Sequence, residues 1–187
     1  FRSILDLSFR LRLKNGGILA AVNDTTVKTA PQGAIDQLGE CLTRLIHAFA
    51  EADDDAKIFM AKWDIKDGFW RMDCRAGEEW NFAYVLPQPE GSQIQLVIPT
   101  SLQMGWVESP PYFCAATETA RDIAAEYTNM PVGTLPPHKF SKYTAGGRSY
   151  SDLRANRGGE SFRSIIEVYV DDFMSLVIPV TTAQLQH

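Results

Sequence analysis

The stretch EVYVDDFMSL, from Glu167 to Leu176, decides how the chain is interpreted, because two adjacent carboxylates interrupt a run that is otherwise mostly apolar. The apolar residues on either side predict two short β-strands, with Asp171 and Asp172 forming the turn between them. Aspartate is common in two-residue hairpin turns, so a plain turn is one interpretation. The other is that the pair carries chemistry, and the rest of the chain bears on that choice.

Composition predicts one domain. The chain has 187 residues, 45% of them hydrophobic, which is enough to bury a core. No apolar run approaches the twenty or so residues of a membrane-spanning helix, so we expect no membrane partner. The cysteines are odd in number and widely spaced, which argues against a disulfide framework and a zinc site and favours an intracellular protein, with cytoplasm and nucleus undistinguished. The net charge of -5 does not indicate nucleic-acid binding, and the Phe1 start leads us to expect an internal piece of a longer protein.

Hydrophobic periodicity predicts strands and helices that are interleaved without regular alternation. Residues 5–14 alternate between apolar and polar, which predicts a half-buried strand closed by a turn at KNGG. Helical spacing predicts two amphipathic helices, over about 34–51 and 110–127. The segment KIFMAKWDI predicts a strand buried on both faces, and WNFAYVL with QIQLVIP predicts a hairpin. Residues 131–163, rich in Gly, Pro and Ser, predict a loop-rich insertion. The fold class we expect is α+β.

A third carboxylate, Asp64, closes the predicted strand KIFMAKWDI. Carboxylates at the ends of buried strands are costly unless they are neutralised, and three brought together would repel one another unless cations held them. Mg²⁺ prefers oxygen ligands and leaves positions open for substrate phosphates. Asp64, Asp171 and Asp172 therefore predict a two-metal site for phosphoryl or nucleotidyl transfer. The alternatives are that Asp64 is a helix N-cap and that the pair is only a turn.

Three stretches resemble, in chain order, motifs of the reverse transcriptases of retrotransposons. They are DIKDGFW at Asp64–Trp70, QMGWVESPPYF at Gln103–Phe113 and YVDD at Tyr169–Asp172. Ahead of them, FRSILDLSF at Phe1–Phe9 resembles the fingers strand of these enzymes. The resemblance covers most of the chain, with residues 131–163 outside it.

The resemblance implies a fold of fingers and palm, with an antiparallel palm sheet backed by helices. The whole chain, 1–187, would be a single fragment of a reverse transcriptase domain without the thumb and the ribonuclease H domain. The fingers would be mainly 1–57 and 71–104. The palm would be mainly 58–70 and 105–178, with the insertion 131–163 inside it.

The resemblance also implies the catalytic centre. Asp64, Asp171 and Asp172 match the catalytic, metal-binding carboxylates of the family, and the backbone carbonyl of Ile65 would be a further ligand. Two Mg²⁺ ions are the implied cofactors, and Mn²⁺ can substitute. Their role would be to activate the primer hydroxyl and to neutralise the leaving pyrophosphate.

Other residues match positions that contact the nucleotide or the nucleic acid. The nucleotide-binding positions are Arg2, Lys66, Asp67, Gly68, Phe69, Met104 and Gly105. Those at the primer or template are Trp106, Ser109, Pro110, Tyr169 and Val170. Arg2 would hold the triphosphate, or alternatively lie at an exposed strand edge. Phe69 would exclude a ribose 2′-hydroxyl, or alternatively be an ordinary core aromatic. Glycine at Gly105 would let the template base and nucleotide approach closely.

Two features depart from the family pattern. Met104 stands where many relatives carry Gln or Phe, so a polar contact to the nucleotide is in doubt. The insertion lengthens the segment between Trp106 and Tyr169. Its basic residues could bind a phosphate backbone, although such a loop is more often only solvated; they are Lys139, Lys142, Arg148, Arg154, Arg157 and Arg163.

The function we expect is RNA-directed DNA synthesis by a two-metal mechanism, within a longer retrotransposon polyprotein. The expected partners are an RNA or DNA template, a DNA primer, deoxynucleoside triphosphates and the other domains of that polyprotein. One alternative is a catalytically idle remnant of a degraded element that at most binds nucleic acid. An RNA-dependent RNA polymerase would share the metal chemistry, but would be expected to carry a smaller residue at Phe69 and Gly-Asp-Asp in place of YVDD.

Overall fold

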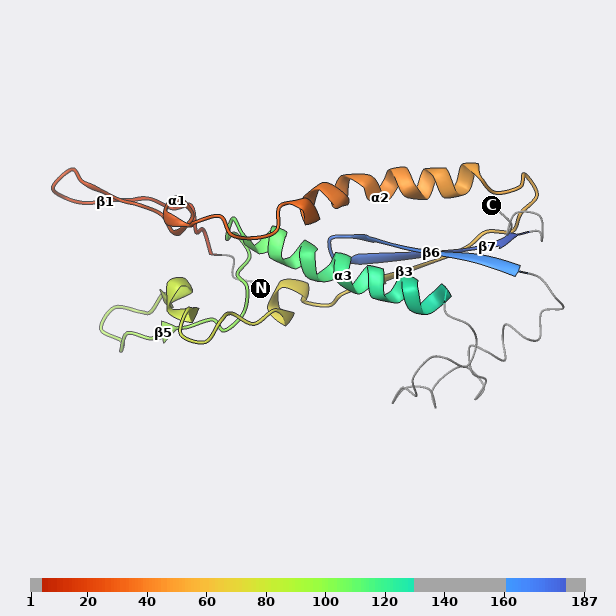
Figure 1. Cartoon of the computed structure of the whole chain (residues 1–187). Coiled ribbons are helices and arrows are strands. Elements are labelled where there is room, and N and C mark those ends of the chain that lie inside the picture. Colours follow the sequence, from red (N-terminus) through yellow and green to blue (C-terminus); the bar gives the residue numbers. More distant parts are fainter. Residues whose placement is uncertain (1–4, 130–160, 181–187) are drawn as a thin grey trace. The chain divides into compact units, whose positions relative to one another are not determined.

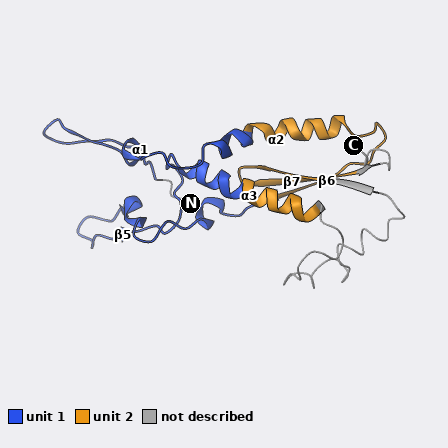
Figure 2. Cartoon of the chain, in the orientation of Figure 1, with its two compact units in different colours: residues 1–38, 65–117 blue, residues 39–64, 118–187 orange. Residues whose placement is uncertain are grey.

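The computed structural model describes residues 5–129 and 161–180 (Figure 1). Arg2 and residues 131–160 of the expected insertion lie outside the described residues. The chain divides into two compact units, which are described separately (Figure 2). Unit 1 comprises residues 1–38 and 65–117, and unit 2 comprises residues 39–64 and 118–187. The structure mixes helices with antiparallel strands, which is compatible with the expected α+β fold class.

The two long helices agree with the helical periodicity of the sequence. α2 spans Gly33–Ala50 and α3 spans Ser109–Asn129. Pro110 and Pro111 occupy the first turn of α3, where a missing N–H costs nothing. Within the described ranges, no helix has the length and apolar content that a membrane crossing requires.

Unit 1 contains two small antiparallel hairpins and several single-turn helices. One hairpin pairs β1 (Leu11–Arg12) with β2 (Ile18–Leu19), and the other pairs β4 (Tyr84–Val85) with β5 (Leu96–Val97). The turn at KNGG is as predicted, with φ +83° at Gly16. The second hairpin pairs the predicted segments, but its strands have only two residues each, and residues 80–82 of the predicted strand lie in a 3₁₀ helix. The remaining elements are α1 (Val22–Thr25) and the 3₁₀ helices η1 (Gly68–Arg71) and η2 (Glu79–Phe82).

The prediction of a half-buried strand over residues 5–14 is wrong. Only Leu11 and Arg12 are in a strand, and Phe9 and Leu13 are 64% and 44% exposed. The alternating apolar residues need a sheet face to cover them. The chain instead folds back at once onto β2 and forms a two-stranded ribbon, which buries neither face.

Unit 2 is built on a three-stranded antiparallel sheet with the strand order β3-β7-β6. β3 spans Phe59–Asp64, β6 spans Ser161–Tyr169 and β7 spans Asp172–Val180. Residues 161–163 therefore belong to a strand and not to the expected loop. Cys41 and Leu45 of α2 pack against Leu176 of β7, and this contact is the centre of the core of unit 2. Three further side chains complete it: Ile58, Ile165 and Met174.

The prediction that β3 is buried on both faces is also wrong. β3 is an edge strand, and all six of its residues are exposed. The apolar run that suggested burial includes Phe59, Met60 and Trp63, whose exposed fractions are 51%, 66% and 54%. An edge strand pairs on one side only, so its apolar content alone does not place it inside a sheet.

Candidate metal centre

Strand pairing brings Asp64 and Asp172 together. β3 and β7 are antiparallel, and their register makes Asp64, the last residue of β3, the direct partner of Asp172, the first residue of β7. Directly opposed side chains in an antiparallel pair lie on the same face of the sheet, about 5 Å apart. The two carboxylates are therefore neighbours although 108 positions of the sequence, from 64 to 172, separate them.

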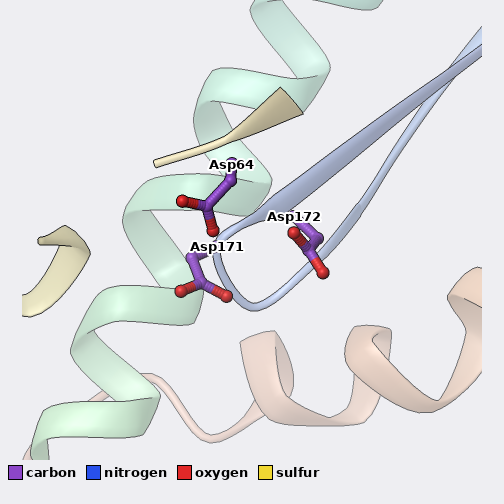
Figure 3. Close-up of side chains that lie close together, drawn as sticks. All are labelled: Asp64, Asp171 and Asp172. Carbon is purple, nitrogen blue, oxygen red and sulfur yellow. The ribbon is translucent and has the colours of Figure 1, made fainter. Parts of the chain in front are cut away.

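Asp171 joins this pair from the turn of the β6–β7 hairpin. The pair Tyr169 and Asp172 closes the hairpin, so the two turn residues are Val170 and Asp171. The predicted turn, Asp171 with Asp172, is therefore wrong by one residue, because Asp172 is already in β7. Figure 3 shows the three side chains gathered at the tip of the hairpin, beside the end of β3. Asp64, Asp171 and Asp172 each offer a ligand atom, and these atoms all lie within 4.8 Å of one another.

The turn that places Asp171 is strained. Val170 has φ +60°, in the left-handed region that β-branched residues rarely enter. Such a conformation costs about 1–3 kcal/mol and persists only where the surrounding structure imposes it. Here the long β6–β7 ladder imposes the conformation of Val170, because its pairing continues up to Tyr169 and Asp172 on either side of the turn. The strain is located beside the three carboxylates, as is common at functional sites.

The electrostatics of this cluster involve a fourth residue, Lys62, which the sequence analysis missed. Its Nζ lies 2.7 Å from Oδ2 of Asp172. The hydrogen bond to Asp172, together with the charges of Asp172, Asp64 and Asp171, raises the pKa of Lys62. Lys62 precedes Asp64 by two residues, so the period of a strand could have indicated that both side chains share a face.

The donor set suits a hard divalent cation. All three ligand groups are carboxylates, which are the oxygen donors that Mg²⁺ and Mn²⁺ prefer. Asp64 is exposed and the two others are half-buried, so the cluster is open to solvent and to a substrate. Two ions about 3.5–4 Å apart, each about 2 Å from its ligands, would need carboxylates at roughly this separation.

The stretch after Asp64 lies in unit 1. The alternative interpretation of Asp64 as a helix N-cap is wrong, because the N-cap of η1 is Asp67, at φ +58°. The carbonyl of Lys66 accepts a hydrogen bond from Nε of Arg71. The carbonyl of Ile65 as a metal ligand stays a prediction.

The aromatic ring of Phe113 is wedged against Gly68 and Phe69. The Phe69 and Phe113 ring centroids are 4.8 Å apart. A Cβ at Gly68 would lie 2.6 Å from Cζ of Phe113, which is 2% exposed. Phe69 is thus packed against Phe113 on one side. This packing agrees with both interpretations of Phe69, the one that excludes a ribose 2′-hydroxyl and the one that makes it an ordinary core aromatic.

The Gly105 loop is held by contacts inside unit 1. Gly105 has φ +95°, and a Cβ there would lie 2.7 Å from the carbonyl oxygen of Leu5. The close approach of the Leu5 backbone therefore requires glycine at position 105, whether or not a nucleotide binds there. Asn23, another residue that the sequence analysis missed, donates from Nδ2 to the carbonyl of Gly105 and accepts at Oδ1 from the N–H of Val107. No local pattern distinguishes such an asparagine from a turn residue.

The residues after Gly105 are anchored in the same unit. The indole N–H of Trp106 donates to Oγ1 of Thr26, and its ring lines a cavity of about 630 Å³ together with Phe82 and Tyr112. Ser109 is buried and donates from Oγ to the carbonyl of Gln103. The geometry assigns no nucleotide or nucleic-acid contact to three more of the predicted residues: Met104 and Val170 are half-buried, and Tyr169 is 46% exposed.

A buried glutamate fixes the start of α3. Glu108 is 1% exposed, and its Oε2 accepts hydrogen bonds from the backbone N–H groups of Thr29 and Ala30, at 2.7 and 2.8 Å. These bonds satisfy the buried carboxylate within unit 1. The residue lies inside the stretch QMGWVESPPYF, but the sequence alone gave it no role.

Comparison with known proteins adds no relative: no protein-family model matches the chain, and no curated protein sequence matches it.

Proposed function

We propose that this chain is the fingers and palm portion of an RNA-directed DNA polymerase, which performs template-directed nucleotidyl transfer by a two-metal mechanism. The observation that carries the proposal is the convergence of Asp64, Asp171 and Asp172 within 4.8 Å. The three residues come from two motifs far apart in sequence, DIKDGFW and YVDD. Their convergence supports a shared role more strongly than either motif alone.

The three carboxylates would hold two Mg²⁺ ions, with the carbonyl of Ile65 as a further ligand. When bound, the ions supply Lewis acidity, activating the primer 3′-hydroxyl and neutralising charge on the leaving phosphates. The protein's own contribution would be to fix the ligand positions. The β3–β7 pairing and the strained Val170 turn support this, because both restrict where the carboxylates can lie.

Further residues would bind the nucleotide and the nucleic acid. Lys66, Asp67 and Gly68 would contact the triphosphate. Arg2 would be the arginine that binds the triphosphate. The Phe69 ring would exclude a ribose 2′-hydroxyl, and its packing on Phe113 supports a fixed orientation. Met104 and Gly105 would lie at the nucleotide. The proposed primer and template contacts are Trp106, Ser109, Pro110, Tyr169 and Val170.

The test is extension of a DNA primer on an RNA template with deoxynucleoside triphosphates and Mg²⁺ or Mn²⁺. It would use this chain and the longer polyprotein expected to contain it. Asp171→Asn should abolish extension, because it removes a charged ligand while preserving the shape of the side chain. The matched control is Asp55→Asn, the same change at an exposed aspartate outside the cluster, which should leave extension unchanged.

Extension that survives Asp171→Asn would refute the two-metal assignment. Binding of primer and template without any extension, in both forms of the protein, would instead favour the idle remnant.

A further inference from the structure

Lys62 already supplies a positive charge to the carboxylate cluster. It lies on β3 two residues before Asp64, on the same face of the strand. Its register partner is Met174, two residues after Asp172, so Lys62 and Asp172 are diagonal neighbours across the β3–β7 pair. The lysine side chain spans this diagonal, and Nζ lies 2.7 Å from Oδ2 of Asp172.

This ion pair occupies one of the two oxygens through which Asp172 could bind a metal ion. The ammonium group takes up one lone pair of this oxygen and lies within hydrogen-bonding distance of it, where a divalent cation bound to Asp172 would also lie close. The two positive charges would also repel each other strongly at such separations. Within the described residues, this is the one ion pair made by a member of the cluster.

We propose that Lys62 is a tethered cation that competes with divalent metal ions for Asp172, so that metal binding displaces its ammonium group. The inference rests on the proposed function, since it concerns the same three carboxylates. Before metal binds, the ammonium offsets part of the repulsion among the carboxylates. After displacement it stays attached to β3 beside the site and is available to pair with a phosphate anion, which a compact ammonium group binds well.

The exchange lowers metal affinity, because each binding event must break the Lys62–Asp172 pair. The side chains of Lys62 and Asp172 are 59% and 29% exposed, so the pair is a partly solvated one and modest in strength. Removing the lysine charge should therefore tighten metal binding by about two- to five-fold. Screening by salt should reduce the difference.

The experiment is a titration of the whole chain with Mn²⁺, followed by the electron paramagnetic resonance signal of the free ion. Lys62→Gln removes the charge and keeps a polar, similarly long side chain. Lys62→Arg keeps the charge. The matched control, Lys57→Gln, removes one positive charge from an exposed lysine near the opposite end of β3 from Asp64. At about 3.3 Å per residue, this lysine is more than a Debye length away.

The expected result is that Lys62→Gln binds Mn²⁺ about two- to five-fold more tightly than the unchanged chain, while Lys62→Arg and Lys57→Gln do not. Saturable binding that appears only in Lys62→Gln would also support the exchange. Equal or weaker binding by Lys62→Gln would overturn the inference and leave the metal site standing, provided that Asp64→Asn abolishes binding. Absence of binding in every form would overturn both.

Discussion

Glu167 of β6 and Arg44 of α2 form an ion pair inside unit 2, with Oε2 of the glutamate 2.6 Å from Nη2 of the arginine. Only 4% of the glutamate side chain is exposed. Nη1 of Arg121 in α3 lies 4.0 Å from Oε2 of the same glutamate, and Arg121 also pairs with Glu118. The network ties α2, α3 and β6 together, and β6 leads directly into the turn that carries Asp171.

Glu167→Gln should destabilise unit 2, because it removes the carboxylate that pairs with the guanidinium groups of Arg44 and Arg121. Breaking a buried pair by removing one partner typically costs about 3–5 kcal/mol. Arg44 keeps 29% of its side chain exposed, so we expect a loss near the lower end, about 3 kcal/mol. The measurement is the urea midpoint, with Glu126→Gln, an exposed glutamate of α3, as the control. Equal midpoints for the two variants would contradict the prediction.

Gly68→Ala should destabilise unit 1 by about 1–3 kcal/mol, the usual cost of overpacking. The new methyl group would meet the buried Phe113 ring at 2.6 Å. Gly39→Ala provides the control, since nothing lies within 4 Å of a Cβ at this exposed position in α2. It should stabilise by about 0.5–1 kcal/mol through helix propensity.

Replacing Phe113 with the smaller leucine should relieve the loss of stability caused by Gly68→Ala. In the double variant with Phe113→Leu, the two effects should be less than additive, because the same contact causes both. Fully additive changes in unfolding free energy would show that the contact is not the cause.

Phe69→Ala should raise incorporation of ribonucleotides relative to deoxynucleotides, if the proposed polymerase activity holds. The ring is held against Phe113 at a centroid distance of 4.8 Å, so its removal opens space that neighbouring side chains do not readily fill. The measurement is kcat/KM for both nucleotide types in primer extension. Phe9→Ala, at a 64% exposed position, should leave the ratio unchanged. An unchanged ratio in Phe69→Ala would disprove the steric role.

The Asp24 carboxylate should titrate with a pKa of about 2, below its usual 3.8. Hydrogen bonds from Arg10 and from the N–H of Ala21 favour its charged form. Because the pKa is lowered in the folded state, the stabilisation is fully present above pH 3.8 and is lost as the pH falls through about 2. The measurement is the ¹³C carboxyl shift against pH. Arg10→Met should move the midpoint upwards, and a midpoint near 3.8 in the unchanged chain would contradict the prediction.

Local sequence patterns were sufficient to predict the two long helices, α2 and α3, and the two strands β6 and β7. The apolar spacing predicted helices over 34–51 and 110–127, and the structure has α2 at Gly33–Ala50 and α3 at Ser109–Asn129. The apolar runs around YVDD predicted β6 and β7. These elements depend on periodicity within one segment, which a single sequence carries. The family resemblance also identified the three aspartates, and its functional meaning stays a prediction.

Only the tertiary structure decided which strand lies beside which. The sequence does not show that β3 pairs with β7 at the edge of the sheet, nor that the register places Asp64 opposite Asp172. It also did not show that the turn falls at Val170–Asp171, or that Lys62 reaches Asp172. Register is fixed by contacts between segments far apart in the chain, and a shift of one residue would turn every side chain to the other face. The candidate residues could therefore be named from the sequence, whereas their convergence required the folded sheet.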